Sequence, residues 1–491
     1  MIIARASAGS SRGSLATLSL LFAFAIVNAI LIGASQWVLL TGLLIVGAVV
    51  FLLFVSGRGM EDKQGWILVI GWCAMLFIPV LRHLSGVPAG YVLELLVFGL
   101  ALAGVRQVWA IASNDRVLRL LLGLLALHFV FALLSTALGR SRPLAALWQF
   151  QYNLKWPLMF AIGMLVVWND RVDRVVRAML RYSLIVILPV VIVEIVMPDA
   201  YTNVFGASTS SSVNPIIGAA VRYRGPFGHP GYLAIVSALL ATAAMAQIVA
   251  GRSRWWGVLA IVYGGLVLLT GQRQELLALG ACFLLFLAFC VRPHLILFGL
   301  AMGIVSVVIA AAYIYLEYLP LRTTLIRWGV IDDVIPYSER AILTMKGLAV
   351  AQQYFPLGSG LGTYGGAGAQ KFDLSLFQDL GFGRYWWFMQ GKFLVDTYWP
   401  NVAAESGLFG AAFLLAFFAT MWIALLVRTW RLLGNAQIGF VFLGLCALTL
   451  LLLNSPSSQI LTDPRGAIVL WTIIGASWRL TNSNSERVAD A

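Results

Sequence analysis

The sequence predicts an all-α integral membrane protein: a polytopic bundle of about 14 transmembrane helices with one large helical loop on the outer face. Apolar residues make up 61% of the 491 residues, against about 45–50% in soluble domains. Charged residues make up 11%, against about 25% in ordinary chains. Apolar runs of about 20 residues, the length that crosses a bilayer, recur along the chain. This composition excludes a soluble enzyme, a disordered chain and a fibrous protein.

The predicted spans follow the apolar runs in order. They cover approximately residues 14–34, 36–56, 65–82, 88–105, 118–138, 156–169, 178–197, 229–250, 254–271, 275–291, 294–316, 405–427, 436–453 and 466–480. The sixth and the last are short, and if one or both are re-entrant the bundle has 12 or 13 spans. The first run follows Arg5 and Arg12, and a second apolar run comes almost at once. We therefore interpret the first run as a retained helix and not as a cleaved signal peptide.

The basic character of the chain predicts its orientation in the membrane. The net charge is +13, and most Lys and Arg residues lie in short loops between apolar runs. Cytoplasmic loops collect such residues, so we attribute the charge to topology and expect no nucleic-acid partner. If the N-terminus is cytoplasmic, 18 of the 33 Lys and Arg residues lie on the cytoplasmic side. Seven of the other residues fall in one long loop, and the positive-inside rule counts short loops only. Both termini are therefore predicted to be cytoplasmic.

Three segments organise the chain: residues 1–316 with the first eleven spans, residues 317–404 with the large outer loop, and residues 405–491 with the last three spans and a tail. A structureless loop of that length is uncommon, so the middle segment is expected to fold as a small module. No clear internal repeat is visible, which counts against a transporter built from inverted repeats.

The first candidate site is the Gly- and Pro-rich stretch Arg222–Gly231, directly before the eighth span. Its composition favours an extended or irregular backbone. In an extended stretch residues two apart point the same way, so Arg222 and Arg224 are expected to aim two guanidinium groups at one spot. A guanidinium group binds phosphate in bidentate fashion, through two parallel N–H···O hydrogen bonds. The alternative is a pair of anchors for lipid headgroups.

The second candidate site is Thr270–Glu275, a connection between two spans. It is so short that Arg273 must lie close to the hydrocarbon region of the membrane. An ionisable side chain there costs free energy, so a functional role is the first interpretation. The alternative is a local ion pair between Arg273 and Glu275.

The third candidate site lies in the long loop, where Arg340 precedes an apolar stretch and a glycine-rich turn follows at 358–366. Residues 360–365 match the pattern GxGxxG, but no strand and helix surround them, so a dinucleotide site is rejected. The glycines are expected to serve tight turns or a close approach of the backbone to a ligand.

The fourth candidate site leads into the twelfth span and contains two carboxylates, Asp396 and Glu405. A carboxylate acts as a base when its surroundings tune its pKa. Asp396 is either such a base or the partner of an arginine, and Glu405 is interpreted as a structural group that favours a helix N-terminus. Among the four histidines, His229 is the one that lies inside a candidate site, and no cluster resembles a metal centre.

These four stretches, in this order, resemble the O-antigen ligase and polymerase superfamily, which includes Wzy-type polysaccharide polymerases and WaaL-type ligases. Arg222–Pro230 is similar to the family's Arg-Gly-Phe-Pro segment, and Thr270–Arg273 to its Thr-x-Ser-Arg turn. Arg340 and Pro356–Gly362 resemble the start of its large periplasmic loop. Asp396-Thr397, nine residues and then Gly407–Gly410 are similar to the ligases' His-Asn, nine residues and Gly-x-x-Gly.

The resemblance implies a bacterial inner-membrane glycosyltransferase that acts on undecaprenyl-pyrophosphate-linked oligosaccharides at the periplasmic face. It implies no cofactor and no metal, membrane lipid as surroundings, and a chain-length regulator and a flippase as further partners. The implied pyrophosphate clamp is Arg222, Arg224, Arg273 and Arg340, with Asp396 and Arg273 catalytic. Contacts to sugar or acceptor are expected from His229, Tyr398, Trp386 and Trp387, although aromatic anchoring at the membrane interface explains the tryptophans equally well.

The sequence departs from the ligases at one informative position. Ligases of this family carry histidine where this chain has Asp396, which favours the polymerase branch. An O-antigen ligase or protein O-oligosaccharyltransferase remains the alternative. A flippase for lipid-linked sugar is the second alternative, and it is disfavoured because few charges lie within the predicted spans; Glu94 and Glu194 are the main ones.

Overall fold

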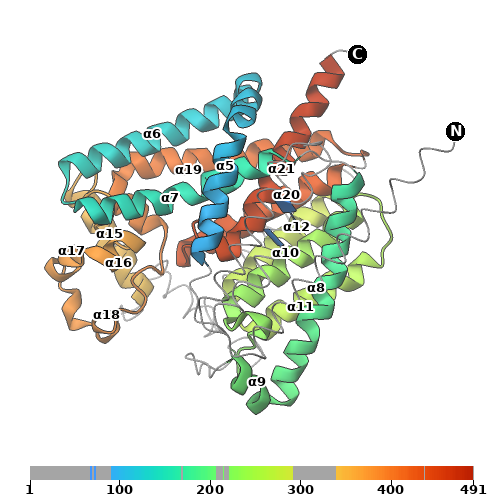
Figure 1. Ribbon diagram of the computed structural model, residues 1–491, viewed down its shortest axis with the longest axis horizontal. Helices are drawn as coiled ribbons and strands as arrows, with labels where there is room; N and C mark the ends of the chain where they lie inside the picture. The colour runs from blue at the N-terminus through green and yellow to red at the C-terminus, as the bar shows by residue number, and fades with distance from the viewer. Residues whose placement is uncertain are drawn as a thin grey trace.

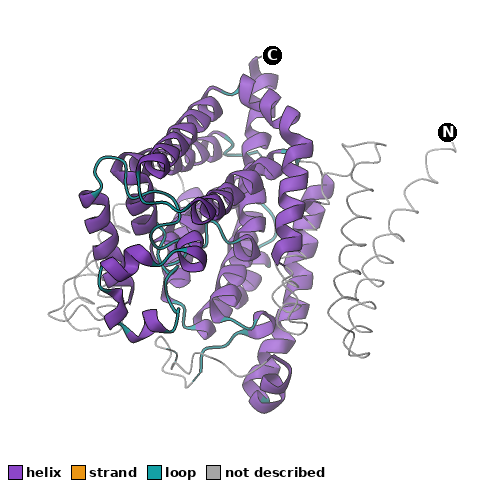
Figure 2. Ribbon diagram, turned by 60° about the vertical axis from the view of Figure 1, so that its left-hand side comes forward, coloured by secondary structure: helices purple, strands orange, loops and turns teal. Residues whose placement is uncertain are grey.

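The computed structural model describes residues 67–68, 71–72, 90–166, 170–205, 214, 221–290, 339–435 and 437–489. The predicted spans at 14–34, 36–56 and 294–316, nearly all of the span at 65–82 and the beginning of the long loop lie outside these residues. Within the described part, every regular element is a helix, which confirms the predicted all-helical class (Figures 1 and 2).

The helix bounds match most of the predicted spans. The long helices are α5 (Gly90–Asn114), α6 (Arg116–Leu138), α7 (Pro143–Met164), α8 (Asp170–Val196), α10 (Pro230–Val249), α11 (Trp256–Thr270), α12 (Arg273–Cys290), α19 (Trp399–Arg431), α20 (Ile438–Asn454) and α21 (Pro464–Ala489). Six helices of the described part are long and apolar enough to cross a membrane: α6, α8, α10, α12, α19 and α20. The sequence and these helices together indicate a membrane protein.

Helix α7 is the main difference from the predicted spans. It begins at Pro143, not near residue 156, and ends at Met164. Polar residues in its first half lower the hydropathy there, so the first half does not resemble a span in the sequence. The fold uses one of them: the Gln149 side chain accepts a hydrogen bond of 3.0 Å from the backbone N–H of Gly368. The first half of α7 therefore holds the segment that follows the glycine-rich turn.

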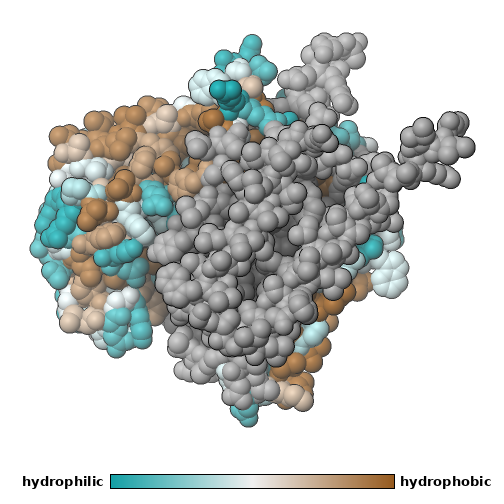
Figure 3. Space-filling model, viewed as in Figure 1, coloured by the Kyte–Doolittle hydropathy of each residue, from teal (hydrophilic) through white to brown (hydrophobic). Residues whose placement is uncertain are grey.

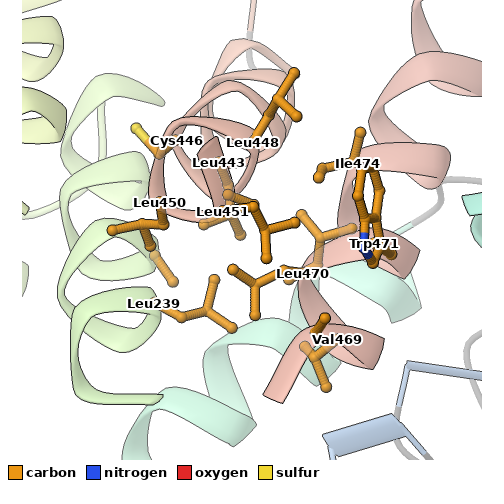
Figure 4. Packing of buried hydrophobic residues seen from close by; sticks show 14 of the residues in the cluster. Leu239, Leu443, Cys446, Leu448, Leu450, Leu451, Val469, Leu470, Trp471 and Ile474 are labelled. Atoms are coloured by element: carbon orange, nitrogen blue, oxygen red, sulfur yellow. The ribbon is translucent and has the colours of Figure 1, made fainter. Parts of the chain in front are cut away.

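The helices form two neighbouring groups (Figure 1). Helices α6, α7 and α19 lie together on one side, and α8, α10, α11, α12 and α20 lie on the other, with α21 packed against both α7 and α20. The core between α10, α20 and α21 is built from aliphatic side chains and Trp471 (Figure 4). Leu239, Leu450 and Leu470 contribute one side chain from each of the three helices. Because α20 is apolar on all sides, it lies in the interior.

Asp115 ties three helices together at one end of the bundle. Its side chain caps α6 by accepting hydrogen bonds from the backbone N–H groups of Val117 and Leu118. Its second oxygen accepts from Arg428 of α19 at 2.9 Å and from the indole N–H of Trp478 of α21 at 2.8 Å. The carboxylate therefore fixes the register between α6, α19 and α21.

The described part of the long loop is a folded module of short helices, called here the loop module (residues 339–398). It contains α15 (Glu339–Gln353), α16 (Ala367–Phe372), α17 (Ser375–Asp379) and α18 (Trp386–Met389). These pack around their own aromatic cluster, with Phe377 and Phe382 fully buried. Two ion pairs connect the module to the link between α6 and α7: Arg140–Asp379 at 2.7 Å and Arg142–Asp373 at 3.2 Å.

The surface reflects this division. Apolar side chains gather over α6 and α19, whereas hydrophilic side chains are prominent on the loop module (Figure 3). The exposed apolar residues of these two helices include Leu133, Leu134, Leu415 and Ile423, which are about half exposed. Such faces are typical of helices that contact lipid.

Candidate functional site

Two of the predicted site segments lie side by side. The backbone N–H of Tyr223 donates a hydrogen bond of 3.3 Å to the carbonyl of Leu269, which brings the Arg222–Gly231 stretch against the end of α11. Gly271 ends that helix in the left-handed conformation, with φ of 64°, and Arg273 begins α12 two residues later. The Gln272 amide lies beside Gly231. The two segments therefore meet at one end of the bundle.

Arg224 does not have the extended backbone that the sequence predicts for this stretch. Its backbone lies in the helical region, with φ of −116° and ψ of −22°, because a 3₁₀ turn (η2, Gly225–Phe227) begins directly after it. The alternation of an extended strand is therefore interrupted at Arg224. Its buried guanidinium lies 3.5 Å from Glu194 of α8 and 5.0 Å from the ring centre of Tyr201. The backbone N–H groups of Arg224 and Gly225 also donate to Glu194, so this arginine holds the turn in place.

Glu275 is a buried carboxylate in the first turn of α12. The charges of Arg222 and of Arg340 both act on the Glu275 carboxylate. Glu275 is 9% exposed, so it is shielded from the water that would screen these charges. The Glu275 carboxylate therefore lies within electrostatic range of arginines from the first and third predicted site segments.

Arg340 also forms an ion pair with Asp396. Its guanidinium nitrogen Nη2 lies 3.3 Å from Oδ2 of Asp396, and the two side chains are 32% and 30% exposed. Burial raises the pKa of Asp396 above its usual value; the charge and the hydrogen bond of Arg340 oppose this shift, and the negative charge of Glu339 adds to it. The sequence leaves two interpretations of Asp396 open, a base or the partner of an arginine. In the structure Asp396 is paired with Arg340 and its pKa is raised, so the two interpretations are compatible.

Arg273 is the first residue of α12 and is half-buried. It stands two residues before Glu275, at the same end of the bundle as Arg222. Arg222 and Arg273 therefore lie at the same end of the bundle, Arg340 is paired with Asp396, and Arg224 is held against Glu194.

The glycine-rich turn is a structural element bound by Glu405. The buried Glu405 carboxylate accepts hydrogen bonds from the backbone N–H groups of Gly362, Thr363 and Tyr364, the last at 3.1 Å. This supports the structural interpretation of Glu405, although its partner is the turn and not the N-terminus of its own helix. Gly358 approaches Gly407 of α19 so closely that a Cβ atom would lie 2.4 Å from the Gly407 nitrogen. The close backbone approach that the sequence predicts here is to the protein's own chain.

His229 caps α10. Its ring nitrogen Nδ1 accepts a hydrogen bond of 3.0 Å from the backbone N–H of Gly231. The ring also contacts Tyr232, whose hydroxyl group donates to Asp463 at 2.6 Å. His229 is exposed and lies near Gln272, so it borders the site while it serves as a helix cap.

The predicted aromatic contacts divide into one exposed and two buried residues. Trp387 is 2% exposed and stacks on Tyr385 with ring centres 5.5 Å apart. Tyr398, directly before α19, is 4% exposed and is therefore also buried. Both belong to the core in this structure, which leaves no free face for a sugar ring, contrary to expectation. Trp386 is 60% exposed, and its face remains accessible.

Two residues at or near the site were not among the predicted ones. The sequence analysis considers Glu275 only as the ion-pair partner of Arg273; an acidic residue in the first turn of α12 is the signal that marks it. Gln459 donates from its side-chain amide to the carbonyl of Gly365 at 2.7 Å and joins the turn to the segment before α21. No sequence signal marks Gln459, because its role depends on packing. Among the described residues, no group of three His, Cys, Asp or Glu side chains is arranged to hold a metal ion.

Comparison with known proteins gave no family assignment. No family model matches the chain, and no curated protein matches it. The resemblance to the O-antigen ligase and polymerase superfamily therefore stays a prediction that rests on the residues and their spacing.

Proposed function

We propose that the protein is a membrane glycosyltransferase that polymerises undecaprenyl-pyrophosphate-linked oligosaccharide repeats into a surface polysaccharide. Two observations support this proposal: the stretch that begins with Arg222 lies against the end of α11, next to Arg273, and Arg340 forms an ion pair with Asp396. These residues come from four separate segments of the chain. The proposal includes the topology predicted from the sequence: about 14 spans, both termini cytoplasmic, and the loop module at the periplasmic face of a bacterial inner membrane.

The chemistry of the reaction explains these residue types. A hydroxyl oxygen of one lipid-linked glycan forms a bond to the anomeric carbon of another, and the bond from that carbon to the pyrophosphate oxygen breaks. The electron pair leaves with the pyrophosphate, whose developing charge arginine side chains stabilise. The hydroxyl proton passes to a carboxylate, for which Asp396 is the candidate. A single displacement of this kind inverts the configuration at the anomeric carbon.

Two single variants in the native host test the proposal. Arg273→Ala and Asp396→Ala are each expected to abolish polymer and to leave single lipid-linked repeats, because one removes charge stabilisation and the other the proton acceptor. The measurement is a profile of lipid-linked glycans and surface polymer at equal membrane levels of each protein. Long lipid-linked chains without surface transfer would indicate the alternative, a ligase. Normal polymer from both variants would remove these residues from the mechanism.

The raised pKa of Asp396 predicts an acidic limit to activity. An aspartate accepts a proton only when ionised, so transfer should decline as pH falls through its pKa, at a higher pH than the ordinary value of about 3.9 implies. Glu339→Gln removes a negative charge that raises this pKa and should move the decline to lower pH. Initial rates of the purified enzyme, measured across the acidic range, compare the two proteins. A decline at the same or a higher pH in the variant would contradict the assignment.

A further inference from the structure

Helix α8 carries a groove of about 530 Å³ near the end where the helix begins. Within the described part of the chain, the groove is lined by residues of α8 itself: Arg174, Arg177, Ala178, Arg181, Tyr182 and Ile185. These residues follow one another at intervals of about three or four, so they share one face of the helix. Three arginine side chains therefore extend from one face within two helical turns.

An ion-pair network at the same end of α8 leaves an excess of positive charge. Asp173 lies 2.6 Å from Arg177 of α8 and 2.6 Å from Arg252, in the link between α10 and α11. One carboxylate thus serves two guanidinium groups. Arg174 and Arg181, on the same face of α8, are exposed and add two further positive charges. The groove is therefore a basic site that is complementary to an anion.

Aromatic residues indicate that the groove lies at a membrane interface. Trp255, directly before α11, is 77% exposed, and Tyr182, in the wall of the groove, is 66% exposed. The Arg181 guanidinium lies 5.5 Å from the ring centre of Trp256, a cation–π contact that orients this arginine. Tryptophan and tyrosine gather at the level of the lipid headgroups. The topology predicted from the sequence makes this the cytoplasmic interface.

The face of α8 that carries the groove continues along the helix as an exposed apolar stripe. Ile185, Ile192 and Val196 follow Arg181 on this face, and each is about half to two-thirds exposed. Arginines thus stand at the interfacial end of a face whose remainder is aliphatic. An anionic phospholipid has the matching chemistry, because its phosphate binds guanidinium groups and its acyl chains contact aliphatic side chains.

We propose that this groove binds the headgroup of an anionic phospholipid, with Arg174 and Arg181 as the ligands of its phosphate. Basic pockets at the cytoplasmic ends of membrane helices bind such headgroups. The groove is separate from the site proposed for glycan transfer. Glu194, which holds Arg224, is also on α8 but lies about 20 Å further along the helix axis than Arg181. Lipid binding here is therefore independent of the proposed function.

Replacing Arg174 and Arg181 by glutamine tests the proposal, because glutamine keeps a polar side chain and removes the charge. Each arginine near an anionic lipid contributes about fivefold in affinity. Arg174→Gln alone should therefore weaken the binding of phosphatidylglycerol about fivefold, and the double variant about 25-fold. The affinity for phosphatidylcholine, which carries no net charge, should change by less than about twofold. Native mass spectrometry of the full-length protein, titrated with each lipid, measures the affinity for the first lipid molecule bound.

A matched control removes the same charge from the same predicted side of the membrane. Arg116 and Arg119 are exposed at the start of α6 and do not line this groove. Arg116→Gln combined with Arg119→Gln should keep the affinity for phosphatidylglycerol within about twofold of the wild type.

Three results would overturn the inference. An equal loss of affinity in the control would assign lipid binding to general surface charge. Displacement of phosphatidylglycerol by inorganic phosphate at equal concentration would show that the groove does not select a lipid. An unchanged affinity in the double variant would remove the arginines from lipid binding, and a change in oligomeric mass in that variant would identify a second copy of the chain as the occupant.

Discussion

Replacing Arg340 by alanine is expected to reduce glycan transfer by about 100-fold or more, which is the usual loss when one group that stabilises developing charge is removed. Arg340 forms an ion pair with Asp396, so it joins the anion-binding and proton-accepting parts of the proposed site. The measurement is the initial rate of polymer formation by purified protein with a lipid-linked donor. A variant with the wild-type rate would contradict the role of Arg340.

The fold should tolerate this change. The Arg340–Asp396 pair is about one-third exposed, and pairs of this kind contribute about 0–1 kcal/mol to stability. A loss of activity can therefore be separated from a loss of folding by comparing thermal unfolding. Arg140→Ala is the control, because Arg140 forms a somewhat more exposed pair with Asp379 of the loop module, at 2.7 Å. It should leave the rate of transfer unchanged.

The double variant distinguishes a pair that acts together from two independent residues. If Arg340 and Asp396 act as one unit, Arg340→Ala combined with Asp396→Asn should lose little more activity than the worse single variant. Independent roles would instead multiply the two losses. Rates of the four proteins, measured under the same conditions, give the coupling directly.

Replacing Gly407 by alanine is expected to destabilise the protein by about 3 kcal/mol or more, the combined cost of backbone strain and overpacking. Gly407 lies inside α19 with φ of 74° and ψ of 173°, a conformation that breaks the helix and that side chains other than glycine rarely adopt. A Cβ atom there would lie 2.3 Å from the carbonyl oxygen of Pro356. The substitution therefore strains α19 and pushes it away from the glycine-rich turn.

Thermal unfolding of the detergent-solubilised protein measures this effect. Gly123→Ala is the control, because Gly123 lies within α6, where nothing stands within 4 Å of an added Cβ atom. It should leave stability unchanged or slightly higher, since alanine favours a helix over glycine. A Gly407 variant as stable as this control would show that the kink in α19 is not required.

Particular residues show how far the sequence predicts the site. The segments that carry Arg222, Arg273, Arg340 and Asp396 could be selected because charges and glycines interrupt apolar runs, which is a local signal. The helical backbone of Arg224 could not be predicted, because it depends on a 3₁₀ turn that packs against Glu194. The burial of Trp387 likewise depends on the aromatic cluster of the loop module, and no pattern in Tyr385–Phe388 indicates which rings face inward.

By itself the sequence determined the helical class and the positions of most described helices, because a bilayer requires long apolar runs and these are visible in composition alone. Predicted and observed bounds agree closely for α10, α12 and α20. The tertiary structure decided the first half of α7, whose polar residues are satisfied by the loop module. It also decided that Arg340 pairs with Asp396 and Arg224 with Glu194. These contacts join residues far apart in the chain, and their geometry arises from packing, on which local sequence patterns carry no information.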